Sequence, residues 1–351
     1  MVTKLWDSPE IYGIDVPMPN NPLRNLNAYV IRTPERSLVV DTGFNRPECR
    51  DALWAGIRKL ELDHAKTVLF LTHFHSDHIG LVWDFVEQGV PVYMGRVEHG
   101  YYEMLQSDGL REMGERFLEE GFPREQLARQ NSENQGRRYA PRPGFPVKEV
   151  EDGARLDLGG VEIQAIHTPG HTPGHMVLYL PEQEFLFSGD HILFDITPNI
   201  SIWPKVADPL ADYITSLQKI RRRPVRAAFP AHRAAGPDTR RRIDQIIEHH
   251  GQRLDEIYQA VAAHPGSTAY EVVGHIHWSA RGLAWEQFPP HQQWFAMAET
   301  VAHLYHLTAR GQLLRLQEDG AVRYMIRAIS PPRSAGLIVS IKTVKEGSSS
   351  S

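Results

Sequence analysis

The chain has 351 residues, of which 41% are hydrophobic and 23% are charged, and its formal net charge at pH 7 is −5. This composition is typical of a globular protein with room for two domains. The acidic balance argues against a surface that mainly coats nucleic acid or anionic membrane. The single cysteine, Cys49, excludes an intramolecular disulfide framework and favours a reducing compartment. No apolar run is long enough for a signal peptide or a membrane span, so we expect a cytoplasmic protein with no membrane partner.

The first part of the chain alternates strand and helix signals. Residues 27–41 predict a β-hairpin that ends in the carboxylate of Asp41. Apolar side chains at helical spacing predict a helix over residues 47–60, and the apolar run 67–71 predicts one buried strand. This strand–helix–strand order favours an α/β fold over an all-β fold.

Residues 72–80, with the sequence THFHSDHIG, carry four groups that can bind a metal. Residues two apart in extended backbone point the same way, so His73 and His75 can face one ion. Asp77 and His78 follow the bend and can face a second ion. Imidazole and carboxylate together suit Zn²⁺, iron or Mn²⁺ rather than Ca²⁺. We therefore predict a metal site here in preference to a polar loop with accidental histidines.

Residues 96–135 are mostly helical in composition, with a broken apolar face. An insertion of this kind can form a lid over the metal-binding loop, because such insertions often shape substrate pockets. A helical pair packed on the sheet away from the site explains the same pattern equally well. Residues 136–146, rich in Gly, Pro and Arg, predict a loop.

The next part of the chain repeats the pattern of short strands that lead into polar loops. Strands are predicted within residues 154–166, 176–188 and 226–231. Each of these regions leads to one candidate ligand, in order His171, Asp190 and His232. The metal-capable residues therefore all follow the ends of short strands, as one rim of a layered sheet structure presents them.

Taken in order, these candidate ligands resemble the five motifs of the metallo-β-lactamase superfamily, and the resemblance spans about residues 10–235. It implies an αββα sandwich with a dinuclear metal site along one edge. The first ion would be held by His73, His75 and His171, the second by Asp77, His78 and His232, and Asp190 would bridge the two. Asp41 would orient a ligand or its water. The motif Thr-Pro-Gly-His-Thr selects His171 as the ligand, which leaves His167 and His175 with supporting roles.

The resemblance also implies a reaction. Two divalent ions about 3.5–4 Å apart can share a hydroxide and lower the pKa of water from about 15.7 towards 7. That bridging hydroxide attacks a carbonyl or phosphoryl centre, and Asp77 and Asp190 are the expected catalytic carboxylates, Asp77 as a proton acceptor. We expect a metal-dependent hydrolase with two divalent ions, Zn²⁺ first and iron or manganese as alternatives. A persulfide dioxygenase with a single iron stays open, whereas nothing after His232 resembles the flavodoxin-like domain of oxygen-reducing diiron members.

The sequence differs from several known branches of the superfamily, and these differences narrow the range of expected substrates. Asp190 stands near the place where true β-lactamases carry a cysteine, and only 42 positions separate it from His232, too few for the large insertion of one nuclease branch. The sequence HILF after Asp190 lacks the tyrosine of many lactone-cleaving members. The string TPGHTPGH resembles glyoxalase II, although no counterpart of its basic glutathione-binding residues is found. We prefer a small-molecule ester or thioester as substrate, and a single-strand endoribonuclease is the alternative.

Residues 236–330 predict three helices followed by a hairpin, a layout that resembles a winged-helix module such as β-lactamase-like endoribonucleases carry. This region has nine arginines, no lysine and ten acidic residues, a net charge of −1. A nucleic-acid partner is therefore not favoured, and the module is more suited to cover the active-site edge or to pair subunits in a homodimer. The arginine clusters at 221–226 and 240–242 could steer an anionic substrate or simply be solvated helix ends.

The loop that follows the bridging carboxylate, residues 191–204, offers three candidate substrate contacts, His191, Asp195 and Trp203. A loop that leaves a metal ligand is well placed to touch substrate, although a structural turn is an equal alternative. The expected organisation is thus a catalytic domain over 1–235, a winged-helix-like module over 236–330 and a flexible tail over 331–351.

Overall fold

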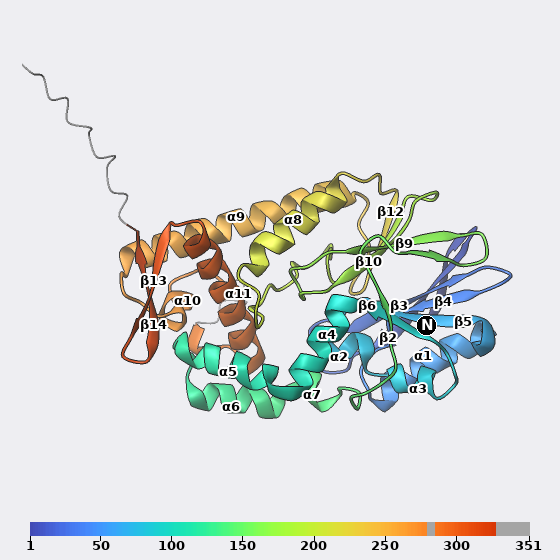
Figure 1. The fold of residues 1–351 in the computed structure, drawn as a ribbon, viewed down its shortest axis with the longest axis horizontal. Coiled ribbons are helices and arrows are strands. Elements are labelled where there is room, and N and C mark those ends of the chain that lie inside the picture. The colour runs from blue at the N-terminus through green and yellow to red at the C-terminus, as the bar shows by residue number, and fades with distance from the viewer. Residues whose placement is uncertain (279–284, 328–351) are drawn as a thin grey trace, which may run out of the picture.

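The computed structural model describes residues 1–278 and 285–327, so the predicted tail at 331–351 lies outside the described residues. Two β-sheets form the centre of the fold (Figure 1). The first has seven strands in sequence order: β1 (Val2–Asp7), β2 (Glu10–Pro17), β3 (Asn25–Arg32), β4 (Ser37–Val40), β5 (Thr67–Leu71), β6 (Val92–Gly95) and β7 (Lys148–Val150). The second has the order β12 (Ala227–Pro230), β11 (Phe185–Gly189), β10 (Met176–Leu180), β9 (Glu162–His167) and β8 (Arg155–Asp157).

Helices cover the outer faces of both sheets (Figure 1). On the seven-stranded sheet lie α1 (Pro47–Lys59), which buries Leu53 and Ile57, and the short α3 (Val82–Val86). On the five-stranded sheet lie α8 (Pro209–Arg221) and α9 (Thr239–Ala263). Between the sheets, Phe187 and Phe229 stack with ring centroids 4.7 Å apart, in one apolar cluster with Phe70. The prediction of an α/β fold with an αββα sandwich is confirmed.

The candidate ligands gather at one edge because parallel strands present their carboxyl ends on the same side of a sheet. β4 and β5 are parallel, so Asp41 and the 72–78 loop emerge together. β11 and β12 are parallel as well, so Asp190 and His232 emerge together from the other sheet. The loop with His171 follows β9, which pairs with β10 in that second sheet.

The segment 96–135 is helical, as expected. It forms α4 (Arg96–Met104), a π-helical turn at Leu105–Gly109, α5 (Leu110–Glu119) and α6 (Arg124–Glu133). α5 and α6 lie beside the C-terminal helices rather than on a sheet (Figure 1). The rings of Phe117 and Trp294, one from each region, are 4.1 Å apart. A lid function for this segment stays a prediction. The expected loop at 136–146 begins with a short helix, α7 (Gln135–Arg138), because the Asn134 side chain accepts a hydrogen bond from the Arg137 N–H.

The C-terminal region contains α9, α10 (Ala269–Val273), α11 (Pro290–Ala309) and a hairpin of β13 (Leu313–Glu318) and β14 (Ala321–Ile326). Thr268 and Glu271 cap α10 reciprocally, with the Thr268 N–H donating to the Glu271 carboxylate at 2.7 Å. α10 is the second of the three helices expected in this region. The helix and hairpin order agrees with the sequence, and the winged-helix likeness and the domain boundaries stay predictions. None of the helices in the described parts of the chain has the length and apolar character needed to cross a membrane.

Glu120, the residue that follows α5, joins the 96–135 segment to the C-terminal region. Its buried carboxylate accepts hydrogen bonds from the Tyr324 hydroxyl at 2.9 Å, from Arg315 Nη2 at 3.0 Å and from the Tyr305 hydroxyl at 3.3 Å. We expect Glu120→Ala to lower the free energy of unfolding by about 1–3 kcal/mol, because it leaves the buried Tyr324 hydroxyl without a partner. Urea titration measures this change, with the exposed neighbour Glu119→Ala as the control that should move stability by less than about 0.5 kcal/mol. Equal effects of the two substitutions would contradict the role of the Glu120 contacts.

Candidate metal centre

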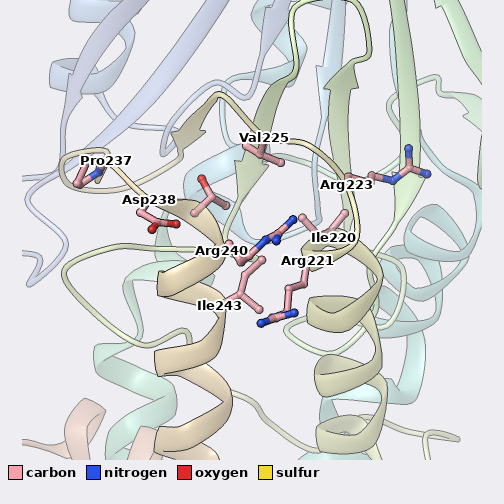
Figure 2. Close-up of a pocket in the computed structure, with 9 residues that line it drawn as sticks. Ile220, Arg221, Arg223, Val225, Pro237, Asp238, Arg240 and Ile243 are labelled. Carbon is pink, nitrogen blue, oxygen red and sulfur yellow. The ribbon is translucent and has the colours of Figure 1, made fainter.

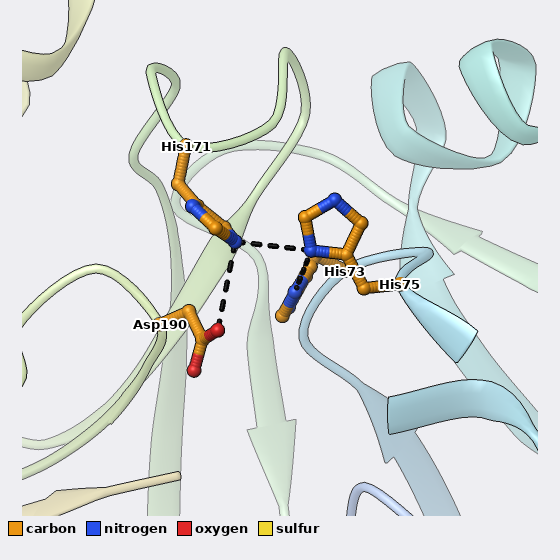
Figure 3. A group of neighbouring side chains, drawn as sticks. All are labelled: His73, His75, His171 and Asp190. Atoms are coloured by element: carbon orange, nitrogen blue, oxygen red, sulfur yellow. Dashed lines mark hydrogen bonds and ion pairs between the residues drawn. The ribbon is translucent and has the colours of Figure 1, made fainter. Parts of the chain in front are cut away.

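The structure brings all seven candidate metal ligands together at the strand-end edge. They form two groups, and within each group one possible ligand atom per residue lies within 4.8 Å of the others. The first group is His73, His75, His171 and Asp190 (Figure 3), and the second is Asp77, His78 and His232. Asp77 and His78 lie in the one-turn helix α2 (Ser76–Ile79), directly after the loop with His73 and His75.

The first group is tightly convergent. Nε2 of His73 and Nε2 of His171 each lie 3.0 Å from Nδ1 of His75. Oδ2 of Asp190 lies 3.5 Å from Nε2 of His171 (Figure 3). Three imidazole nitrogens and one carboxylate oxygen therefore point at a common place.

The second group faces the other oxygen of the same carboxylate. Nε2 of His232 lies 3.4 Å from Asp190 Oδ1 and also 3.4 Å from Asp77 Oδ2. Nε2 of His78 lies 3.7 Å from Asp190 Oδ1 and 3.9 Å from Asp77 Oδ2. Asp190 thus turns Oδ2 to the first group and Oδ1 to the second, which is the disposition required of a bridging ligand.

Backbone carbonyls fix the orientation of two imidazoles. Nδ1 of His171 donates to the Asn199 carbonyl at 2.9 Å, and Nδ1 of His232 donates to the Asn25 carbonyl at 2.8 Å. A carbonyl oxygen only accepts, so the hydrogen must reside on Nδ1 in both residues. Nε2 is therefore the nitrogen that each ring turns towards the centre and offers to an ion.

Asp41 orients two further ligands. Its Oδ2 accepts from Nδ1 of His78 at 2.8 Å and from the Thr72 hydroxyl at 2.8 Å. The hydrogen of that hydroxyl points to Asp41, so its oxygen accepts a hydrogen bond from Nδ1 of His73 at 3.0 Å. Both imidazoles are thereby held with Nε2 facing the centre, which is how an outer carboxylate fixes the tautomer of a metal-binding histidine.

These groups fit a bound cation. Nε2 of His78, Nε2 of His232 and Oδ1 of Asp190 are buried and have no hydrogen-bond partner among the described residues. Buried polar atoms without partners are costly, and each of these three has a lone pair that a divalent ion would satisfy. Nε2 of His73 and Nε2 of His171 both lie close to the same atom, Nδ1 of His75. That nitrogen carries at most one hydrogen and can donate to only one of them, so hydrogen bonding does not explain why all three nitrogens converge. Nitrogen and carboxylate donors suit Zn²⁺, iron and Mn²⁺.

The two groups differ in their protonation without an ion. Burial lowers the pKa of His75 to about 3 and also lowers the pKa of His73 and of His171, so these rings are neutral at pH 7. Burial also opposes charge on His78 and His232. There the neighbouring carboxylates, Asp41 first for His78 and Asp190 first for His232, outweigh burial and raise the pKa of both rings.

His175 and His167 take supporting places, as the sequence indicated. The buried His175 accepts the Asp190 N–H at Nε2 over 3.2 Å, and its Nδ1 lies 3.0 Å from the Thr168 hydroxyl. Nε2 of His167 lies 3.0 Å from the Pro173 carbonyl. His175 therefore holds the backbone of Asp190.

Of the three candidate substrate contacts, the structure brings Trp203 beside the metal centre. Its indole ring lies 6.1 Å from the ring of His75 and 5.3 Å from that of Phe74. His191 is fully buried, with its ring 5.3 Å from that of Tyr213. Asp195 is exposed on the surface of the same loop. Substrate contact by these residues stays a prediction.

A pocket elsewhere on the molecule lies between the end of α8 and the start of α9 (Figure 2). It contains three residues of the two arginine clusters, Arg221, Arg223 and Arg240, and none of the candidate ligands. Arg221 is paired with Asp244 at 2.6 Å, and Arg223 donates to the Gln164 side chain at 3.1 Å. This pocket is separate from the metal centre, and two of its three arginines are already engaged.

The layered sheets and the ligand-bearing edge define a metal-dependent hydrolase. The chain belongs to the metallo-beta-lactamase superfamily, whose family model matches residues 22–232. A second model, described as the metallo-beta-lactamase-like C-terminal domain, matches residues 254–327. Both the superfamily and the presence of a C-terminal domain agree with the resemblance inferred from the motifs.

Solved structures and curated proteins support the same assignment. A metallo-beta-lactamase family protein from Thermus thermophilus is 28% identical with a TM-score of 0.76, covering 90% of this chain and 98% of that one. A beta-lactamase domain protein from Burkholderia ambifaria is 25% identical with a TM-score of 0.79, covering 93% and 94%.

Among curated relatives, a Beta-lactamase-like protein 2 homolog from Caenorhabditis elegans is 27% identical over 74% of each chain. The protein named atrochrysone carboxyl ACP thioesterase AgnL7, from Paecilomyces divaricatus, is 25% identical over 87% of this chain and 78% of its own length. A thioesterase of the same name from Aspergillus fumigatus is 24% identical over 69% of this chain, and that match spans only about half, 46%, of the fungal protein.

Proposed function

We propose that this hydrolase cuts an ester or thioester, with a thioester as the first expectation, at a centre that holds two divalent ions. The observation that carries the dinuclear part is the position of Asp190, whose two carboxylate oxygens face the two ligand groups separately. Thioester chemistry is supported by relatives named as thioesterases, one of which matches 87% of this chain. Zn²⁺ is the expected metal, with iron and manganese as alternatives.

Each of the two ligand groups would bind one ion. His73, His75 and His171 would hold one ion, Asp77 and its partners His78 and His232 the other, and Asp190 would bridge them. When bound, such ions supply Lewis acidity and an activated water at neutral pH.

Asp77 is suited to a second task. Burial raises the pKa of its carboxyl, but His78 and His232 outweigh burial and lower that pKa to about 2. Asp77 is therefore ionised at neutral pH. An ionised carboxylate beside the ions can orient the attacking water and accept a hydrogen bond or a proton from it.

The surroundings of the centre suit an acyl group better than a phosphodiester. Trp203 and Phe74 are aromatic neighbours of His75. Phe295 of α11 is 51% exposed, and its carbonyl accepts a hydrogen bond at 2.9 Å from Asn199, the residue that orients His171. Trp203 and Phe74 are themselves buried, so Phe295 supplies the exposed apolar surface that an acyl chain gains by covering. A nuclease instead needs a basic track to neutralise phosphates.

A substrate panel tests this proposal. The purified protein, reconstituted with Zn²⁺, Mn²⁺ or Fe²⁺, is assayed on an acyl-thioester series, an aryl-ester series and a labelled single-stranded RNA. We expect turnover of the acyl compounds only. Cleavage of RNA alone, with a rate that falls steeply as salt increases, would overturn the acyl assignment in favour of an endoribonuclease.

Trp203→Ala tests whether the indole contacts the acyl chain. We expect kcat/KM for long-chain acyl substrates to fall about tenfold, with a smaller loss for acetyl substrates, because a larger apolar contact is removed from the longer chain. Trp203→Phe keeps an aromatic ring and serves as the matched control. The same loss for short and long chains would show that Trp203 supports the fold of the centre and not the substrate.

A further inference from the structure

We infer that Glu98 is a positioning residue for the first ligand group, and that it sets the placement of His75 and His171 through the two loops that carry them. This inference rests on the proposed metal centre. Glu98 is not part of the metal-binding motifs. It lies in the first turn of α4, in the segment between the two halves of the sandwich.

The carboxylate of Glu98 connects the two loops directly. Oε1 accepts the N–H of Phe74, the residue between His73 and His75, at 2.7 Å. Oε2 accepts the Gly174 N–H at 2.8 Å and the Thr172 hydroxyl at 3.0 Å. One side chain therefore ties the loop after β5, which belongs to the first sheet, to the loop after β9, which belongs to the second.

The backbone of α4 is pressed against the His171 loop. A Cβ placed on Gly174 would lie 2.1 Å from the Glu98 backbone nitrogen and 2.5 Å from its Cα, so no other residue fits there without displacement. A Cβ on Gly95 would lie 2.7 Å from the Met176 sulfur. This close approach fixes the start of α4 relative to the loop, and with it the position of the Glu98 carboxylate.

The type of contact argues for positioning rather than for general stability. Glu98 is fully buried, and its hydrogen-bond donors in the described part of the chain are neutral, two backbone N–H groups and one hydroxyl. Burying a carboxyl group without a counter-charge is costly, and burial raises the pKa of Glu98 to about 8. The three directed hydrogen bonds offset part of that cost, and all three end on the two loops.

The second ligand group is held by other means. His78 is oriented by Asp41, and His232 by the Asn25 carbonyl. The three hydrogen bonds of Glu98 end on Phe74, Thr172 and Gly174 instead. A change at Glu98 is therefore expected to weaken metal binding at the first group and to leave the second group unchanged.

Glu98→Gln tests this selectivity in two backgrounds. The amide has the size of the carboxyl group, and the affinities are compared at pH 9, above the pKa of Glu98, where the carboxylate accepts all three hydrogen bonds. The NH₂ of the amide must face one of the three donors, so at least one hydrogen bond is lost. His232→Ala weakens the second group and reports on the first, and His171→Ala does the reverse. Zn²⁺ affinity is measured by competition with a chromophoric chelator, so that the result does not depend on catalysis. We expect Glu98→Gln to weaken Zn²⁺ binding about 10–100-fold in the His232→Ala protein and to leave it unchanged in the His171→Ala protein.

The controls separate the possible failures. Glu103→Gln, an exposed glutamate on the same helix, should change neither affinity. Equal losses in both backgrounds, or no loss in either, would overturn the role of Glu98. If Glu98→Gln does not fold, Thr172→Val removes one of the three donors at constant size and is judged by the same two affinities. Failure of the unaltered protein to bind Zn²⁺ would refute the proposed metal centre itself, which is a different outcome.

Discussion

Asp190→Asn is expected to remove hydrolysis while leaving the fold intact. The asparagine keeps the size of the side chain, but its NH₂ replaces one of the two oxygens that face the ligand groups, and an amide nitrogen does not bind a cation. Substitutions of residues that only support metal ligands typically cost about 10–100-fold, so loss of the bridging ligand should lower kcat/KM by at least about a hundredfold. His75→Ala is expected to have the same effect, because its Nδ1 lies 3.0 Å from both neighbouring imidazoles.

The assay uses the acyl substrate that the panel identifies, with bound metal measured by elemental analysis and folding by circular dichroism and thermal unfolding. Asp255→Asn, an exposed position on α9, makes the same chemical change far from the ligands and should retain activity. Activity near that of the unaltered protein in Asp190→Asn would refute hydrolysis at this centre. Loss of activity together with loss of the folded state would shift the test to His75→Ala.

The gathering of the candidate ligands was predictable from the sequence because their chemistry resides in the side chains themselves. Imidazoles and carboxylates that follow short strands, as in the 72–80 segment, at His171, Asp190 and His232, meet wherever those strand ends share an edge. The parallel pairing of β4 with β5 and of β11 with β12 places these strand ends at the same edge. Asp41 was predictable for the same reason, since it ends a strand next to the histidine loop.

Glu98 was not predictable, since its function depends on backbone N–H groups that every non-proline residue possesses. It lies 24 positions from Phe74 and 76 from Gly174, so no local spacing signals the contact. The placement of α5 and α6 was equally inaccessible, because the partner of Phe117 is Trp294 of the C-terminal region. By contrast, α8 was overlooked although Leu210, Tyr213, Leu217 and Ile220 have helical spacing and are buried.

The two ligand groups are expected to respond differently to acid. Without an ion, the neighbouring carboxylates outweigh burial and raise the pKa of His78 and of His232, so each ring keeps its second proton to a higher pH than a free imidazole does, and an incoming ion must displace that proton. Below these raised pKa values, metal affinity falls about tenfold per pH unit for each displaced proton, or about a hundredfold for the two rings. His73, His75 and His171 have lowered pKa values and are already neutral, so affinity at the first group should change little between pH 7 and pH 6.

Zn²⁺ competition titrations at pH 7 and pH 6 measure this difference. The His171→Ala protein, which keeps the second group, should lose affinity steeply as the pH falls, and the His232→Ala protein, which keeps the first, should lose little. Calorimetry in buffers of different ionisation enthalpy counts the released protons independently. If Zn²⁺ affinity depends on pH equally in the two proteins, the neighbouring carboxylates do not control the pH dependence of metal binding at the second group. An unequal slope would also predict that mild acid lowers hydrolysis by releasing the second ion before the first, because both ions are required for the proposed reaction.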